Sequence, residues 1–307
     1  MDAQLPRVIL VTRKTPLELL LERHGTLSQA RFYLESRGQT IEEYIEVQER
    51  FAAALGAVQQ AIPPDQRRAR VDRDQLDRFL FAPDDVVVVV GQDGLVPNAA
   101  KYLNGQLTIG VNPDPEHYDG VLCRHPPAAA SRLLAWTRKR DKTFKVEQRT
   151  MALARREDGQ ELLALNEIFV GHQTHQSARY RIVFKGKEER QSSSGVICST
   201  GTGSTGWARS ISLQRDCAGR LPKPEDRRLF WMVREPFPSV DTQTTLSLGG
   251  LRYNQVLELR SEMAEGGVIF ADGIEADRVE FLFGHVVTIG IAPSTLNLVV
   301  PDEGGSR

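Results

Sequence analysis

Cysteine is scarce in this chain of 307 residues: there are three, and they stand far apart at Cys123, Cys198 and Cys217. An odd number at such wide spacing matches neither a disulfide framework nor a zinc site, and it fits a reducing, cytoplasmic environment. The net charge is also close to zero, because the chain has 39 Lys and Arg residues and 40 Asp and Glu residues. The chain therefore lacks the basic character of a nucleic-acid-binding protein.

Long hydrophobic runs are also missing. No segment approaches the roughly 20 apolar residues of a membrane-spanning helix, and the run from Val8 to Val11 is too short for a signal peptide. We expect a cytoplasmic protein that has no nucleic-acid or membrane partner. With 307 residues and 40% hydrophobic content, the chain is long enough for two domains, each with its own core.

The first part of the chain alternates strand-like and helix-like patterns. Strands are expected at 7–12, 86–90 and 107–111, and helices at 16–37, 40–61 and 128–138, with Thr40 as the N-cap of the second helix. The charged segment 66–78 is expected to be a surface loop and a short helix. Alternation of this kind predicts a parallel sheet, so residues 1–130 should form an α/β domain that binds nucleotide or phosphate.

After about residue 141 the pattern changes to short strand-like runs that are separated by turn signals, so the boundary should lie near residues 126 to 142. Asp158-Gly159, between two alternating segments, is a strong hairpin signal. Closely spaced strands without long helices between them predict an all-β, sandwich-like domain over residues 131–307.

The most informative stretch begins with five consecutive valines, Val86 to Val90, which are typical of a strand buried on both faces of a parallel sheet. The strand ends at the turn Gly91-Gln92-Asp93-Gly94, and a helix-compatible segment follows. Such a unit gathers backbone N–H groups and lets a phosphate approach closely. It also places Asp93 at the carboxyl end of a strand, where open α/β sheets bind ligands. The alternative is that Asp93-Gly94 is only a turn.

A second stretch, Ser199 to Gly206, packs hydroxyls and glycines into one loop between a short strand and helix-like sequence that starts at Trp207. The loop offers backbone and hydroxyl hydrogen bonds, and Trp207 offers an aromatic edge for a base or ribose. It is not a Walker loop, because no Lys followed by Ser or Thr comes after the glycines. A flexible linker is the alternative.

Two further polar positions stand in apolar surroundings. Asn166-Glu167 lies within an apolar strand-like run, and buried polar side chains need partners, so this pair either binds a ligand or bonds to neighbouring loops. Asp272-Gly273 has the sequence of a hairpin turn. His172 and His175 have no evident third ligand, so we expect no metal site at these histidines.

In this order, the four motifs resemble those of the NAD kinase family. The family's GGDG is matched by residues 91–94, its Asn-Glu pair by 166–167, its TPTGSTAY loop by 200–207, and its late Asp-Gly by 272–273. The segments IGVNPDPEHYDGVLC, SSGVICSTGTGS and MVREP resemble the branch that contains the mitochondrial NAD kinases of animals. The resemblance spans residues 7 to 300, and it implies an α/β domain followed by a β-sandwich, with the site between them.

The resemblance implies ATP-dependent phosphorylation of the adenosine ribose 2′-hydroxyl of NAD to give NADP. Asp93 would be the general base, while the turn and Mg²⁺ would hold the phosphates of ATP. A homodimer or a larger homo-oligomer is expected, as in the family. The remaining phosphate- and nucleotide-binding residues would be Gly91, Gln92, Gly94, Asn166, Glu167, Thr202, Gly203, Ser204, Thr205, Trp207, Ser210 and Asp272.

Four positions depart from the family pattern. Gln92 replaces a glycine, Leu95 replaces a threonine, and Gly201 and Gly206 replace the Pro and the Ala of the loop. A reshaped site favours two alternatives: a kinase of the same fold that acts on another ribosyl acceptor such as a nucleoside, or a catalytically silent, nucleotide-binding regulatory protein. The phosphate donor and the choice between NAD and NADH stay open.

Overall fold

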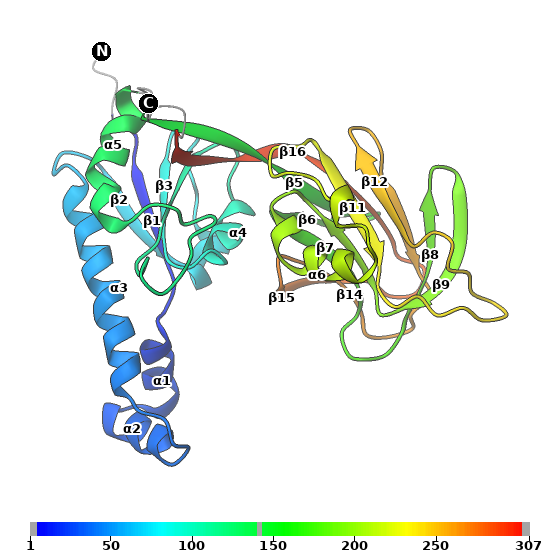
Figure 1. The fold of residues 1–307 in the computed structure, drawn as a ribbon, viewed down its shortest axis with the longest axis horizontal. Helices are drawn as coiled ribbons and strands as arrows, with labels where there is room; N and C mark the ends of the chain where they lie inside the picture. The colour runs from blue at the N-terminus through cyan, green and yellow to red at the C-terminus, as the bar shows by residue number, and fades with distance from the viewer. Residues whose placement is uncertain (1–4, 140–142, 303–307) are drawn as a thin grey trace. The chain divides into compact units, whose positions relative to one another are not determined.

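The computed structural model describes residues 5–139 and 143–302, and the chain forms two compact units (Figure 1). The first unit comprises Met1–Glu147 together with Asn297–Arg307, and the second comprises Gln148–Leu296. The sequence pattern placed a boundary at residues 130 and 131, whereas the chain leaves the first unit after Glu147 and returns to it for the last strand. This return depends on a pairing between distant segments, which a local pattern does not contain.

The first unit is built on a parallel sheet in the order β2-β1-β3-β4-β16. All five valines of β3 are buried, because this strand is paired on both edges and covered on both faces. Phe51 and Val58 of α3 and Leu133 of α5 pack with Val8 and Val88 in one core cluster. The α/β expectation is confirmed. The strands are β1 (Val8–Thr12), β2 (Arg68–Asp72), β3 (Val86–Val90), β4 (Leu107–Val111) and β16 (Val286–Pro301), and the two helices are α3 (Glu42–Ala61) and α5 (Ala130–Lys139).

The helical pattern predicted over 16–37 is two helices, α1 (Pro16–His24) and α2 (Leu27–Glu35). Gly25, with φ of 79°, ends α1, and Thr26 caps α2. The capping box is formed by Thr15 and Glu18. The prediction that Thr40 caps the next helix is wrong: Ile41 occupies the N-cap position of α3, and no side chain caps that helix.

Residues 66–78 are only partly the surface loop and short helix that the charges suggested. They contain the edge strand β2 and the short helix η1 (Arg73–Arg78). Val71 is the one buried residue of β2, while Arg68 and Arg70 are exposed. Charged residues are common on edge strands, where they oppose pairing with another chain. Because of these charges, β2 has no hydrophobic pattern from which a strand could be predicted.

The second unit is an antiparallel β-sandwich, as predicted. One sheet has the order β12-β11-β10-β7-β14-β15, and the other contains β16-β13-β8-β9 with β5 and β6. Side chains of both sheets share a core that includes Val170, Trp231, Tyr180 and Leu259. The strands are β5 (Phe144–Arg156), β6 (Glu161–Ala164), β7 (Glu167–His172), β8 (Ala178–Phe184), β9 (Lys187–Ser193), β10 (Val196–Ser199), β11 (Arg228–Val233), β12 (Leu248–Arg252), β13 (Leu257–Ser261), β14 (Gly267–Ala271) and β15 (Ile274–Glu280).

Two hairpin turns of this unit follow directly from the sequence. Asp158-Gly159 joins β5 to β6, and Gly159 has φ of 89°. Asp272 and Gly273, with φ of 56° and 68°, join β14 to β15. Positive φ at both central residues is the requirement of a two-residue type I′ hairpin turn, which Asp272-Gly273 meets, whereas at the first hairpin the positive φ is that of Gly159. Both turn predictions are confirmed.

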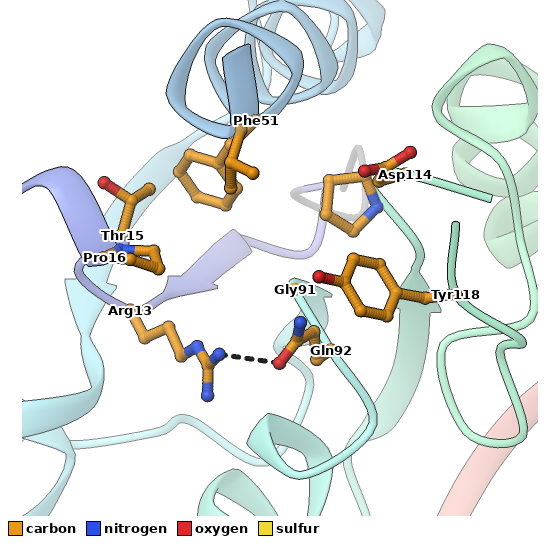
Figure 2. A pocket seen from close by; sticks show the side chains of 10 residues that line it. Arg13, Thr15, Pro16, Phe51, Gly91, Gln92, Asp114 and Tyr118 are labelled. Carbon is orange, nitrogen blue, oxygen red and sulfur yellow. Dashed lines mark hydrogen bonds between the residues drawn. The ribbon is translucent and has the colours of Figure 1, made fainter. Parts of the chain in front are cut away.

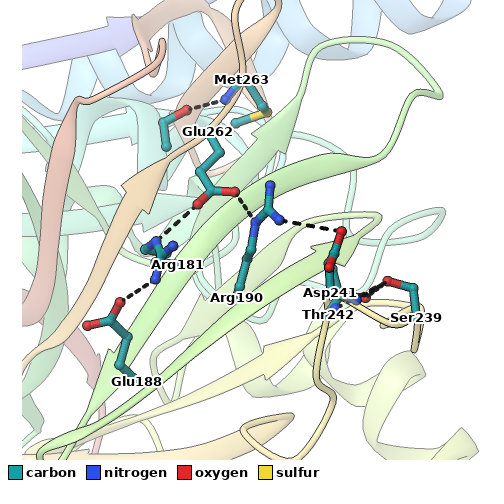
Figure 3. A network of polar contacts seen from close by, with 9 residues as sticks. Arg181, Glu188, Arg190, Ser239, Asp241, Thr242, Glu262 and Met263 are labelled. Atoms are coloured by element: carbon teal, nitrogen blue, oxygen red, sulfur yellow. Dashed lines mark hydrogen bonds and ion pairs between the residues drawn. The ribbon is translucent and has the colours of Figure 1, made fainter.

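An ion-pair network stabilises the β8–β9 side of the sandwich (Figure 3). Arg181 and Arg190 stand directly opposite each other on β8 and β9, an arrangement that is unfavourable for like charges. The Glu262 carboxylate accepts from Arg181 Nε at 3.0 Å and from Arg190 Nε at 2.6 Å, so one anion serves both cations. Backbone N–H groups of Phe237 and Gln243 donate to carbonyls of β9, so the 235–243 loop covers this edge strand.

No helix within the described ranges is both long enough and apolar enough to cross a membrane.

Candidate functional site

The glycine turn follows β3 at the carboxyl edge of the parallel sheet, as the sequence predicts. The carbonyl of Gln92 accepts from the N–H of Leu95, and the carbonyl of Asp93 accepts from the N–H of Val96, which starts the short helix α4 (Leu95–Ala100). The side-chain amide of Asn98 donates back to the carbonyl of Gly94 at 2.8 Å. These bonds fix the conformation of the turn against the start of α4.

The carboxylate of Asp93 accepts three backbone N–H groups from the loop after β4. Oδ2 accepts from Val121 N at 2.8 Å, and Oδ1 accepts from Leu122 N at 3.0 Å and from Cys123 N at 2.9 Å. A carboxylate offers about four acceptor positions, so one remains, on Oδ2. Asp93 thus holds the 121–123 loop and still has room for one further donor such as a hydroxyl.

Two glycines allow the close packing of this loop, one on β4 and one within the loop itself. A Cβ at Gly110 would stand 2.2 Å from the carbonyl oxygen of Leu122, and one at Gly120 would stand 2.0 Å from that of Cys123. Burial, and then the negative charge of Asp93, raise the pKa of the Cys123 thiol far above its usual range. This thiol is therefore inert, and the loop has a structural role around Asp93.

A cavity of about 110 Å³ lies beside the turn, between the ends of β1, β3 and β4 (Figure 2). At one side, Arg13 Nη2 donates to Gln92 Oε1 at 2.7 Å. On another side stands Asp114, which accepts from Arg50 Nε at 2.9 Å and contacts His117 Nδ1 at 2.7 Å. Burial would raise the pKa of Asp114, but hydrogen bonds from His117 and Arg50 outweigh it and lower the pKa. Asp114 therefore stays ionised and paired.

The second unit brings together three of the four motifs. The Asp272 carboxylate accepts from the backbone N–H groups of Leu165 at 3.0 Å, Asn166 at 2.7 Å and Glu167 at 3.2 Å. The N–H of Thr200 donates to the carbonyl of Asn166 at 2.9 Å. These contacts follow from the sheet order, because β7 lies between β10 and β14. The Asn-Glu pair, the hydroxyl-rich loop and the late Asp-Gly therefore form one cluster.

The hydroxyl-rich loop is braced from inside by Thr200, which is fully buried. The Thr200 hydroxyl accepts from the N–H groups of Thr202 at 3.1 Å and Gly203 at 3.3 Å, and the hydroxyl of Ser204 donates to the carbonyl of Thr200 at 3.0 Å. A Cβ at Gly203 would stand 2.3 Å from the carbonyl oxygen of Asn166. The loop is thus ordered and packed against the Asn-Glu pair, and the flexible-linker alternative is wrong.

Known protein structures share this architecture. An NAD kinase from Archaeoglobus fulgidus in complex with ATP is 19% identical in sequence and superimposes with a TM-score of 0.59. The superposition covers 95% of this chain and 92% of the Archaeoglobus chain. A yeast NADH kinase complexed with NADH is 15% identical in sequence and superimposes with a TM-score of 0.60. The superposition covers 97% of this chain and 84% of the yeast chain. The chain has the NAD kinase fold. No protein-family model matches it, and no curated protein matches it either.

Within the NAD kinase fold of this chain, Trp207 belongs to a row of aromatic rings. Its ring stacks on Phe169 with centroids 5.6 Å apart, and Phe169 stacks on Phe270 at 4.7 Å. The guanidinium of Arg234 lies over Trp207, 5.0 Å from the ring centroid. The Thr205 hydroxyl donates to the carbonyl of Thr202, and Ser210 is exposed on α6 (Trp207–Gln214). A nucleotide contact by Thr205, Trp207 or Ser210 stays a prediction.

Several residues of these clusters had no sequence motif of their own. Arg149 is buried, with Nη1 at 3.5 Å from the hydroxyl of Thr202, and only the sandwich brings this β5 side chain to the loop. Asp114 reaches the cavity through an irregular loop. Arg13 was detectable in principle, because it directly follows a predicted parallel strand, and ligands gather at the carboxyl ends of such strands.

Glu167 gives the second unit a pH-dependent stability. The side chain is 9% exposed, and burial, then the charge of Asp272, raise its pKa to about 7. The unfolded chain releases this proton near pH 4.5, so between about pH 4.5 and 7 the folded state binds one proton more. We therefore expect the free energy of unfolding to fall by about 3 kcal/mol as pH rises from 4.5 to 8.

Urea unfolding at pH 5 and pH 8 tests this expectation. Glu167→Gln should remove most of the difference between the two pH values, because glutamine does not titrate. Glu225→Gln, at an exposed position of the same unit, is the matched control and should leave it unchanged. An unchanged pH difference in the Glu167 variant would contradict the assignment.

Proposed function

We propose that this protein is an ATP-dependent kinase that phosphorylates the adenosine ribose 2′-hydroxyl of NAD or NADH. The observation that carries the proposal is Asp93, a carboxylate in a glycine turn at the carboxyl end of a buried strand, in the fold of an NAD kinase and an NADH kinase. Those two proteins were solved with ATP and with NADH, which supports nucleotide donor and acceptor chemistry here.

Asp93 is the proposed general base. Its three backbone N–H bonds stabilise the negative charge and fix the orientation of the carboxylate, and the remaining acceptor position on Oδ2 can take the proton of a ribose hydroxyl. Phosphoryl transfer is catalysed mainly by positioning and charge stabilisation, so an oriented carboxylate is a suitable partner for the attacking hydroxyl.

The donor phosphates are assigned to the turn Gly91-Gln92-Asp93-Gly94, with Mg²⁺ to neutralise their charge. Mg²⁺ in kinases binds largely through phosphate oxygens and water. Among the described residues, no three His, Cys, Asp or Glu side chains form a metal-binding group.

The acceptor is assigned to the cluster in the second unit. Glu167 is a buried carboxyl that can accept from ribose hydroxyls, and Asn166 and the loop residues Thr202, Gly203, Ser204 and Thr205 offer amide, hydroxyl and backbone groups beside it. Asp272 would act through its three bonds to residues 165–167, which hold Asn166 and Glu167 in place. We also expect a homo-oligomer in solution.

Phosphate transfer from Mg-ATP to a panel of NAD, NADH, adenosine and other nucleosides tests the proposal, with products identified by mass. We expect a gain of one phosphate on NAD or NADH, and agreement of the product's proton and phosphorus NMR spectra with those of authentic NADP or NADPH would place it on the 2′-hydroxyl. Transfer to a nucleoside alone would support the second candidate, a kinase for another ribosyl acceptor. Nucleotide binding without transfer to any acceptor would contradict both.

The second candidate rests on the reshaped surroundings of the two clusters. Gln92 adds a side chain at the glycine turn, and Arg234 lies over the ring of Trp207. Each side chain changes the shape of its own cluster, and a smaller acceptor such as a nucleoside is the specific alternative.

A further inference from the structure

The cavity beside the glycine turn carries one uncompensated positive charge. Asp114, which lines the cavity, is already paired with Arg50 and His117. In the part of the chain that the structure describes, Arg13 has a neutral partner, Gln92, and no carboxylate within ion-pair distance. A cavity whose one free charge is a guanidinium favours an anion.

The contact between Arg13 and Gln92 determines which groups face the cavity. A guanidinium has only donors, so the side-chain oxygen of Gln92 must face Arg13, and the NH₂ group is left to donate elsewhere. Figure 2 shows this amide nitrogen turned toward the cavity. The remaining N–H groups of Arg13 are donors as well. Together the two side chains present donors only, which matches the oxygens of a phosphate.

The size and position of the cavity agree with this chemistry. A volume of about 110 Å³ gives room for a phosphate group. Arg13 directly follows β1 and Gln92 belongs to the turn after β3, so two adjacent parallel strands supply the pair. Ligands of open α/β sheets bind at this edge.

We propose that Arg13 and Gln92 together bind a phosphate of the donor nucleotide. The inference rests on the proposed function, because that function places the donor phosphates at residues 91–94. It also explains the departure from the family pattern: the side chain that replaces a glycine positions an arginine and adds its own donor. Arg13 and Gln92 are donor-binding residues in this proposal, and the general base remains Asp93.

Two variants separate this binding role from a structural one. Arg13→Gln removes the charge, and Gln92→Glu keeps the shape and strengthens the contact to Arg13 while cancelling its charge. Both should weaken binding of inorganic tripolyphosphate, measured by calorimetry, by about tenfold to a hundredfold. Both should also raise the KM for ATP by a similar factor. Arg13→Lys should lie in between, because it keeps the charge and loses the fork of donors.

The matched control is Arg67→Gln, at an exposed arginine of the same unit, which should leave both quantities unchanged. Suppose that the wild type transfers phosphate and that both variants bind tripolyphosphate and ATP normally, with an unchanged KM for ATP. That result would overturn the inference and leave the proposed function standing. A raised KM for NAD with an unchanged KM for ATP would assign the pair to the acceptor pyrophosphate instead, which also overturns it. If the wild type binds tripolyphosphate, both variants lose this binding, and the wild type transfers phosphate to no acceptor, the anion site is supported and the proposed function is rejected.

Discussion

Replacing Asp93 by Asn should lower the turnover number by about 10²- to 10⁴-fold, the usual contribution of a general base. An amide cannot take the proton of a ribose hydroxyl. It would also turn an NH₂ group toward at least one of the three N–H donors at Val121, Leu122 and Cys123, since its single oxygen cannot replace both carboxylate oxygens. Steady-state kinetics with the acceptor that the wild type uses is the measurement.

The geometry separates the two consequences of this substitution. Loss of the base lowers the turnover number, whereas loss of a loop bond increases amide hydrogen exchange at residues 121–123. Asp119→Asn removes the same charge from an exposed position of the same loop and should change neither quantity. Faster exchange at residues 121–123 with normal turnover would show that Asp93 is only a structural residue, and the proposed mechanism would then be wrong.

Gly201→Ala should destabilise the second unit by about 3 kcal/mol, because its Cβ would overlap backbone atoms that cannot simply rotate away. The added carbon would stand 1.8 Å from the carbonyl oxygen of Lys223 and 2.1 Å from its carbonyl carbon. That segment is itself fixed, since the carbonyl of Pro224 accepts from the N–H of Thr150 at 3.2 Å. Urea unfolding is the measurement, and nucleotide binding should weaken together with stability as the loop moves.

Gly219→Ala is the matched control for this prediction. Gly219 lies in the same unit, and a Cβ there would have no atom within 4 Å, so its stability should change little. Equal stability of the two alanine variants would contradict the close approach of residues 201 and 223. The same contact explains why the proline of the family loop is absent from this chain: a larger residue at position 201 has no space.

The sequence by itself determined the elements whose cause is local. Five adjacent valines have no polar face, so β3 had to be buried on both sides. Gly159, Asp272 and Gly273 adopt the positive φ that their hairpin turns require, and Asp-Gly pairs do so at little steric cost. The glycine turn with Asp93 was visible for the same reason, because a strand, a turn and a helix start are adjacent in the chain.

Only the tertiary structure decided what these elements contact. Where burial and a local capping preference conflict, burial decides the start of a helix. Thr40 has a side chain that can cap a helix, but the fully buried Ile41 occupies the N-cap position of α3. The pairing of Asp93 with residues 121–123, of Arg13 with Gln92, and of Asp272 with residues 165–167 joins segments that are about 30 to 110 residues apart. Such contacts follow from strand order and from the return of β16 to the first unit. A one-dimensional pattern specifies which residues can form a site, and the sheet topology specifies which of them meet.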